Sequence, residues 1–173
     1  TFPLGIGFIA AYAKKIFGDN VEIKLFKYPE LLSTALKEDP PHIIGFANYC
    51  WNDALNEFFC EKVKSISKSI ITLKGGPNFP LKDIDRIVYL KERPFTDFYI
   101  AKEGESSFVG FLEEYFQKGH ENLKKDPIAG TIFLDENQEM VSGNESLRIP
   151  DLDEIPSPYL NGMLDEFFDG KLS

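Results

Sequence analysis

Apolar and polar positions along this chain follow two alternating patterns. Short, mostly apolar runs, typical of strands buried in a sheet, occur at 42–49, 69–74 and 97–103. Each run is followed by a segment whose apolar residues recur at the spacing of one helix face. This alternation is typical of βαβ units. The sequence therefore predicts an α/β fold built on a doubly wound, mostly parallel sheet.

Five helices and one further strand complete the predicted α/β unit. The segment 21–28 alternates apolar with charged residues, which predicts an edge strand with one face in water. The helices are predicted at 3–17, 29–39, 52–66, 83–92 and 106–118. On the third helix the expected inward stripe is Leu55, Phe58, Phe59, Val63 and Ile66. On the fourth it is Ile84, Ile87 and Val88.

The pattern changes after Pro127. Apolar runs at 128–134 and 138–142 flank Asp135-Glu-Asn137, which predicts a β-hairpin. Closer to the C-terminus, prolines exclude regular structure over most of the segment, with a short helix expected at 161–168. The expected division is an α/β domain at 1–126, a small hairpin appendage at 127–147 and a proline-containing linker at 148–173.

Composition narrows the classes of partner. The net charge is -9 and the pI is near 4.8, which argues against nucleic acid, since affinity for it needs clustered Lys and Arg. No apolar stretch reaches the ~18 residues that span a bilayer, so no membrane partner is expected. Cys50 and Cys60 are too few for a disulfide framework, and no signal peptide precedes them, which favours a cytoplasmic location. The chain begins at Thr1 and runs directly into a predicted helix, so the first strand of the fold is expected to be missing.

The candidate chemistry lies where the predicted parallel strands end, because open α/β sheets bind ligands outside the carboxyl ends of their strands. One strand ends in Gly75-Gly76-Pro77, where glycine allows a sharp bend or the close approach of a ligand. The preceding strand ends in the aromatic residues Tyr49 and Trp51. Glu103-Gly104 opens a helix, where an acidic side chain favours the exposed amides.

The order of these motifs resembles a known family, the N-terminal cobalamin (B12)-binding domain of the B12-dependent radical S-adenosylmethionine (SAM) proteins. The matching stretches are Pro3-Leu-Gly-Ile-Gly7, Ile44-Gly-Phe-Ala-Asn-Tyr-Cys-Trp-Asn52, Lys74-Gly-Gly-Pro77, Lys102-Glu-Gly-Glu105 and Leu152-Asp-Glu-Ile-Pro-Ser-Pro-Tyr159. The resemblance implies a Rossmann-like, flavodoxin-like cobalamin-binding fold. It also implies a set of cofactor-binding residues, namely Ala47, Asn48, Tyr49, Trp51, Asn52, Gly75, Gly76, Pro77, Glu103 and Gly104.

The sequence departs from the wider cobalamin-binding pattern at two motifs. No histidine precedes His42, so the Asp-x-His-x-x-Gly motif that supplies a lower ligand to cobalt is missing. Ala47-Asn-Tyr49 stands where that pattern has Ser-x-Leu, and only Gly75-Gly76 matches outright. The resemblance therefore implies cobalamin held without a histidine ligand, and no other metal site.

Relatives of this kind continue from the proline-containing linker into a catalytic barrel with a Cys-x-x-x-Cys-x-x-Cys motif. Cys50 and Cys60 cannot form that motif. The 4Fe-4S cluster and SAM are thus expected only in a C-terminal barrel of the parent enzyme, a methyltransferase or related protein, and this barrel is the expected partner. The chain alone is not expected to be catalytic.

The candidate site residues also have structural explanations that involve no ligand. The two glycines could serve only a strand-to-helix turn, Trp51 could staple the next helix to the sheet, and Cys50 is expected to be a small buried apolar residue. Helix capping is the favoured role of Glu103-Gly104. A cofactor-less regulatory or interaction domain with the same fold is the main rival. A receiver domain would need an aspartate at the end of the 42–49 strand, which the sequence lacks.

Overall fold

The computed structural model describes residues 3–168, and contacts within the chain divide it into two units. One unit consists of Thr1–Asp39 and Arg148–Ser173, and the other of Pro40–Leu147. Among the described residues, no helix is long and apolar enough to cross a membrane.

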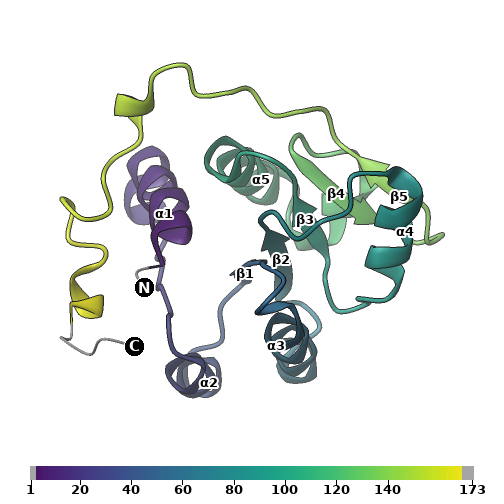
Figure 1. The fold of residues 1–173 in the computed structure, drawn as a ribbon, viewed down its shortest axis with the longest axis horizontal. Coiled ribbons are helices and arrows are strands. Elements are labelled where there is room, and N and C mark those ends of the chain that lie inside the picture. Colours follow the sequence, from purple (N-terminus) through teal and green to yellow (C-terminus); the bar gives the residue numbers. More distant parts are fainter. Residues whose placement is uncertain (1–2, 169–173) are drawn as a thin grey trace. The chain divides into compact units, whose positions relative to one another are not determined.

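The second unit is built on a five-stranded sheet (Figure 1). Its strands are β1 (Ile43–Ala47), β2 (Ile71–Gly75), β3 (Phe98–Ile100), β4 (Thr131–Leu134) and β5 (Met140–Ser142). They lie in the order β1-β2-β3-β4-β5, with the first three parallel and the last two antiparallel. The predicted α/β class, with a sheet that is parallel through β3, is confirmed.

Helices cover both faces of this sheet, as Figure 1 shows. They are α3 (Asp53–Ile66), α4 (Asp83–Lys91) and α5 (Gly104–Lys118), followed by the short 3-10 helix η2 (His120–Lys125). On one face, Phe111 of α5 packs with Leu73, Phe98 and Phe133 from three strands. On the other face, α4 packs against the core around Tyr99. Burial of these apolar side chains is the main force that holds helices to a sheet.

The hairpin predicted at 127–147 lies in the sheet itself rather than outside it. Tyr99 of β3 is the register partner of Ile132 in β4, so the hairpin extends the parallel strands by an antiparallel pair. Its turn is held by Asp135, whose Oδ1 accepts hydrogen bonds from the backbone N–H groups of Asn137 (2.9 Å) and Glu139 (2.8 Å).

The inward faces predicted for α3 and α4 are partly wrong. Leu55, Phe58 and Ile66 on α3 are exposed, as are Ile84 and Val88 on α4. The residues that α3 buries instead are Asn56, Phe59, Cys60 and Val63. This face is turned inward because hydrogen bonds draw the polar Asn56 toward the end of β1, which a pattern of apolar residues cannot reveal.

The first unit contains α1 (Leu4–Phe17), α2 (Pro29–Glu38) and the 3-10 helices η1 (Gly18–Asn20), η3 (Leu152–Glu154) and η4 (Asp165–Phe167). The segment that begins at residue 148, predicted as a linker, packs on α1 (Figure 1). A Cβ on Gly7 would lie 3.2 Å from Pro158 and 3.3 Å from Leu164, and Lys15 Nζ donates to the Glu154 carbonyl at 2.6 Å. The helix expected at 161–168 is reduced to η4.

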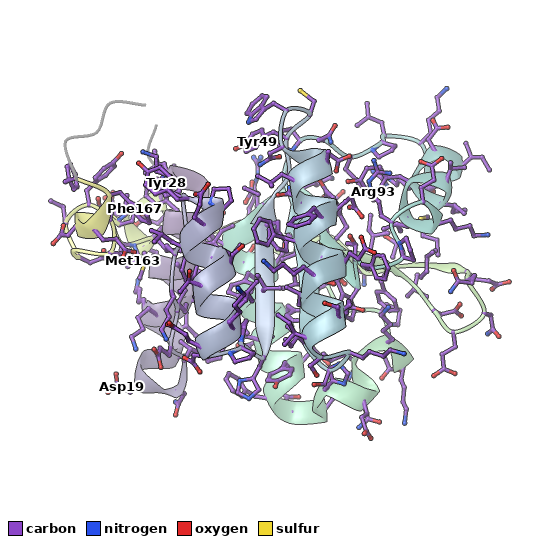
Figure 2. All side chains as sticks on the ribbon, turned by 90° about the horizontal axis from the view of Figure 1, so that it is seen from below. Asp19, Tyr28, Tyr49, Arg93, Met163 and Phe167 are labelled. Carbon is purple, nitrogen blue, oxygen red and sulfur yellow. The ribbon has the colours of Figure 1, made fainter. Side chains whose placement is uncertain are left out.

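The edge strand predicted at 21–28 is not formed. The backbone is extended at Val21 and Tyr28, but no strand is assigned between them. A strand exists only where its N–H and C=O groups meet a neighbouring strand, and alternation alone does not supply that neighbour. A hollow of about 490 Å³ adjoins this segment, lined by Ile23, Lys24, Leu25, Phe26, Ala35, Met163 and Glu166. Figure 2 labels Met163 and Phe167 in this part of the first unit.

Candidate functional site

The turn from β1 into α3 is fixed by one amide side chain. Asn52 Nδ2 donates to the Ala47 carbonyl (2.8 Å), and Asn52 Oδ1 accepts from the Tyr49 N–H (2.8 Å). Asn56 Nδ2 donates to the same Ala47 carbonyl (3.1 Å). Asn52 occupies the N-cap position of α3, but its side chain holds the preceding turn and makes no cap hydrogen bond. The turn is therefore rigidly joined to the end of β1.

This turn presents a stacked aromatic pair. The rings of Tyr49 and Trp51 are 4.6 Å apart and nearly parallel, at 8°, and Figure 2 shows Tyr49 at the end of the sheet where α3 begins. Trp51 is 76% exposed, so it does not staple α3 to the sheet. The expectation that Cys50 is buried is wrong, because Cys50 lies exposed in the same turn. The pair offers a flat apolar surface to solvent.

Asn48, between the strand and this turn, is completely buried. Its Nδ2 donates to the Tyr89 hydroxyl (2.8 Å) and to the Asn78 carbonyl (3.0 Å), and its Oδ1 accepts from Asn56 Nδ2 (3.1 Å). Its polar atoms are thus satisfied within the protein, as buried polar groups require. The side chain of Asn48 joins β1, α3 and α4, and it has no surface left to offer a ligand.

The glycine pair at the end of β2 meets the end of β1 at the same edge. Asn48 N–H donates to the Gly75 carbonyl at 2.6 Å. Gly76 has φ +131°, and a Cβ there would lie 2.5 Å from the Asn48 carbonyl oxygen. A Cβ on Gly75 would meet Ile100 at 3.5 Å, an ordinary contact. The backbone alone therefore requires glycine at Gly76, while Gly76 and the following Pro77 are exposed at the edge.

The third strand end leads into α5 at Gly104, two residues before the predicted start. Glu103 occupies the N-cap position, and its carbonyl accepts from the Ser107 hydroxyl (2.6 Å). Its side chain makes no cap hydrogen bond, whereas Glu105 places an acidic group in the first turn. A carboxylate there stabilises the helix through the helix dipole.

Sequence reasoning missed a partly buried charge cluster beneath this edge. The Lys74 side chain on β2 is fully buried and pairs with Glu57 and, at 3.4 Å, with Asp53, both on α3. Arg93, just after α4, pairs with Asp53 at 2.6 Å and approaches Glu57 at 3.7 Å. Its guanidinium lies 3.8 Å above the Tyr89 ring, and Figure 2 shows it beside α3. We call Lys74, Asp53, Glu57 and Arg93 the charge cluster.

Burial and neighbouring charges together set the pKa values of these groups. Burial lowers the pKa of Lys74 to about 8, although Asp53 acts to raise it. Burial also acts to raise the pKa of Asp53, but the hydrogen bond from Arg93 and the charges of Lys74 and Arg93 outweigh it, so the pKa is lowered. Burial raises the pKa of Tyr99 to about 12 and also raises that of Tyr89. The cluster is held in a poorly solvated place.

One sequence signal could have found the cluster. Lys74 interrupts the apolar run of β2, and Asp53 and Glu57 lie four residues apart on one helix face. Buried charges are paired, so a lysine inside a buried strand predicts nearby carboxylates.

Neither histidine lies at this edge. His42 immediately precedes β1, and His120 follows α5, a helix that starts at the carboxyl edge and ends at the opposite one. Within residues 3–168, no three His, Cys, Asp or Glu side chains gather where they could hold a metal ion.

The chain is similar to a part of larger enzymes. No family model matches it. It is 25% identical over 167 residues to 2-(S-pantetheinyl)-carbapenam-3-carboxylate methyltransferase of Streptantibioticus cattleyicolor. It is 26% identical over 169 residues to the cobalamin-dependent radical SAM methyltransferase TokK of Streptomyces tokunonensis. Both alignments cover 94% of this chain but only 24% of the relative, so the chain spans about a quarter of their length.

Solved structures agree on the fold. The chain matches the cobalamin-dependent SAM radical enzyme OxsB with a TM-score of 0.66, both in its apo form (21% identity) and with aqua-cobalamin and SAM bound (20%). The matches cover 93% and 95% of this chain and 22% of OxsB. The resemblance found in the sequence is confirmed: TokK and OxsB are cobalamin-dependent radical SAM enzymes, and this chain matches one segment of each.

Proposed function

We propose that this chain is the cobalamin-binding module of a radical SAM enzyme and presents cobalamin to a catalytic barrel outside these 173 residues. One observation carries the proposal. In a chain whose relatives are cobalamin-dependent, the carboxyl edge of the parallel strands presents the stacked, exposed pair of Tyr49 and Trp51. Ligands of open α/β sheets bind at this edge.

The residues at the edge fit such a group. A corrin ring is broad and flat, and a rigid aromatic surface buries apolar area against it at little entropic cost. Ala47 next to this surface is small, which leaves room for a large ligand. Both histidines of the chain lie toward the opposite edge, so no histidine of this chain would coordinate cobalt.

The candidate residues take different roles in this proposal. Tyr49 and Trp51 would contact the ring, and Asn52 would hold their turn. Gly75, Gly76 and Pro77 would line the nucleotide tail, with Glu103 and Gly104 at the next strand end. Asn48 supports these positions from inside the protein.

Bound cobalamin would supply a cobalt centre able to carry a methyl group for transfer. This chain would bind and orient it, while the 4Fe-4S cluster, SAM and the reaction would belong to the rest of the enzyme. A cytoplasmic location forms part of the proposal, since both cysteines are free thiols.

The test is a titration of the purified chain with hydroxocobalamin and methylcobalamin, followed in the visible spectrum. Saturable spectral change and cofactor that stays with the protein on gel filtration are expected. Trp51→Ala should weaken binding about tenfold, the value of a lost aromatic contact of ~1.4 kcal/mol. Ile84→Ala, which changes an exposed apolar residue on α4, is the matched control.

No binding at tens of micromolar protein would overturn the proposal. It would leave the rival, a regulatory or interaction domain with this fold. One observation favours that rival: the backbone alone explains the glycine at Gly76, so the motif does not require a bound tail.

A further inference from the structure

We propose that the charge cluster fixes the position of the turn that carries Tyr49 and Trp51 at the carboxyl edge of the parallel strands. The importance of this for cofactor binding rests on the proposed function. The positioning itself is a property of the chain without any ligand.

The cluster reaches the turn by two routes. Asp53 directly follows Asn52, the residue whose side chain holds the Tyr49 N–H and the Ala47 carbonyl. Through space, Asp53 Oδ1 accepts from the Tyr89 hydroxyl at 3.3 Å, and that hydroxyl is 2.8 Å from Asn48 Nδ2. Both ends of the turn are therefore connected to Asp53, one through the chain and one through its carboxylate.

Stability alone does not account for these charges. Taking several ions out of water is costly, and apolar side chains of similar volume often stabilise such a site equally well or better. The cluster sits between β2, α3 and the end of α4, where apolar packing would also hold the elements together. What apolar packing would lack is direction: ion pairs and hydrogen bonds fix where Asp53 and Tyr89 lie.

The charged and titratable groups around Lys74 come from several elements of this unit. Asp53 and Glu57 face it from α3. Tyr99 of β3 is the register partner of Lys74, and Tyr89 of α4 acts on Asp53 and Arg93. Arg93 faces it after α4 and is itself paired with the exposed Glu92. Loss of the proton from Lys74 leaves two carboxylates with one cation, which weakens the hold on Asp53.

Trp51 reports on the turn directly because it is the single tryptophan of the chain. Its indole, stacked on Tyr49, should rotate with the whole protein while the turn is fixed and independently when it is not. Time-resolved fluorescence anisotropy separates these motions as a slow and a fast decay. All proteins should carry Cys50→Ser, so that no thiol lies beside the indole.

The experiment compares the chain with Lys74→Met and Tyr89→Phe across a pH series, without cobalamin. Tyr115→Phe, on the other face of the sheet, is the matched control. In the chain with the cluster intact, the amplitude of the fast decay should be small below pH 8. It should grow as Lys74 loses its proton, with a midpoint near pH 8. Lys74→Met should show the fast decay without that transition. Tyr89→Phe should raise the mobile fraction about fivefold, the factor expected for one lost hydrogen bond.

A parent anisotropy that does not change with pH, together with Tyr89→Phe behaving like Tyr115→Phe, would overturn the proposal. If Lys74→Met fails to fold, the parent pH profile and Tyr89→Phe still decide. If anisotropy behaves as expected but cobalamin does not bind, the positioning role stands and the proposed function falls. If cobalamin binds but the anisotropy does not respond to pH or to these substitutions, the proposed function stands and the positioning role falls.

Discussion

A side-chain carbon on Gly76 would lie 2.5 Å from the carbonyl oxygen of Asn48, so the ends of β1 and β2 can meet as they do only with glycine there. The same approach lets Asn78 N–H donate to the Asn48 carbonyl at 3.3 Å. Two turns that would contact a ligand are thus fastened to each other before any ligand arrives.

Gly76→Ala should destabilise the fold by at least about 2 kcal/mol, because alanine must adopt a positive φ and also displace the Asn48 backbone. Gly75→Ala is the matched control. Its Cβ would make an ordinary contact with Ile100, so its effect should stay within about 1 kcal/mol. Urea unfolding measures both. Equal destabilisation by the two substitutions would show that the close contact with Asn48 is not what requires glycine at position 76.

The architecture could be predicted from the sequence because buried parallel strands and amphipathic helices have different periods. The candidate ligand edge is placed from where those strands end, and it stays a prediction. The faces of α3 could not be predicted, since polar Asn56 is drawn inward by partners distant in sequence. The exposure of Cys50 likewise depends on the turn that Asn52 fixes.

The prediction of a strand at 21–28 is wrong for another reason. A strand needs a neighbouring strand to bond to, and the alternation of apolar and charged residues does not show whether one is present. The charge cluster could not be predicted because its members come from separate elements, namely β2, α3 and the segment after α4. Only Lys74 stands out within an apolar run. Packing partners are set by the tertiary fold, and local patterns carry little of that information.

Removing one charge from the cluster should cost more than removing a balanced pair. Arg93→Met leaves Asp53 and Glu57 with Lys74 alone and should destabilise the chain by about 3–5 kcal/mol. Adding Glu57→Gln restores the balance and should recover most of that loss. Urea unfolding of both variants and of Glu57→Gln alone completes a double-mutant cycle. Additive effects would contradict the pairing.

The lowered pKa of Lys74 makes stability depend on pH in a defined direction. Between about 8, its value in the folded chain, and 10.5, its ordinary value, the unfolded chain holds a proton that the folded chain has released. The contribution of Lys74 to the free energy of unfolding therefore rises with pH across this window. Urea unfolding on both sides of pH 8 should show the parent gaining stability relative to Lys74→Met. A constant difference would mean that Lys74 stays charged.

The packing of the C-terminal segment on α1 depends on the small size of Gly7. Gly7→Leu should push Pro158 and Leu164 away, because even a Cβ would already lie 3.2 Å from Pro158. The exposed stretch around Leu152 should then be cut faster by a protease. Gly5→Leu, where a Cβ meets nothing within 4 Å, is the control. Equal cleavage in both variants would contradict this packing.

The central claim is that cobalamin binds at the turn of Tyr49 and Trp51. Because Trp51 is the only tryptophan, its fluorescence can be followed as hydroxocobalamin is added, with correction for light absorbed by the cofactor. The account predicts saturable quenching with the same midpoint as equilibrium dialysis of the same protein. Dialysis that shows binding while Trp51 emission stays unchanged, or that shows no binding at tens of micromolar, would contradict it.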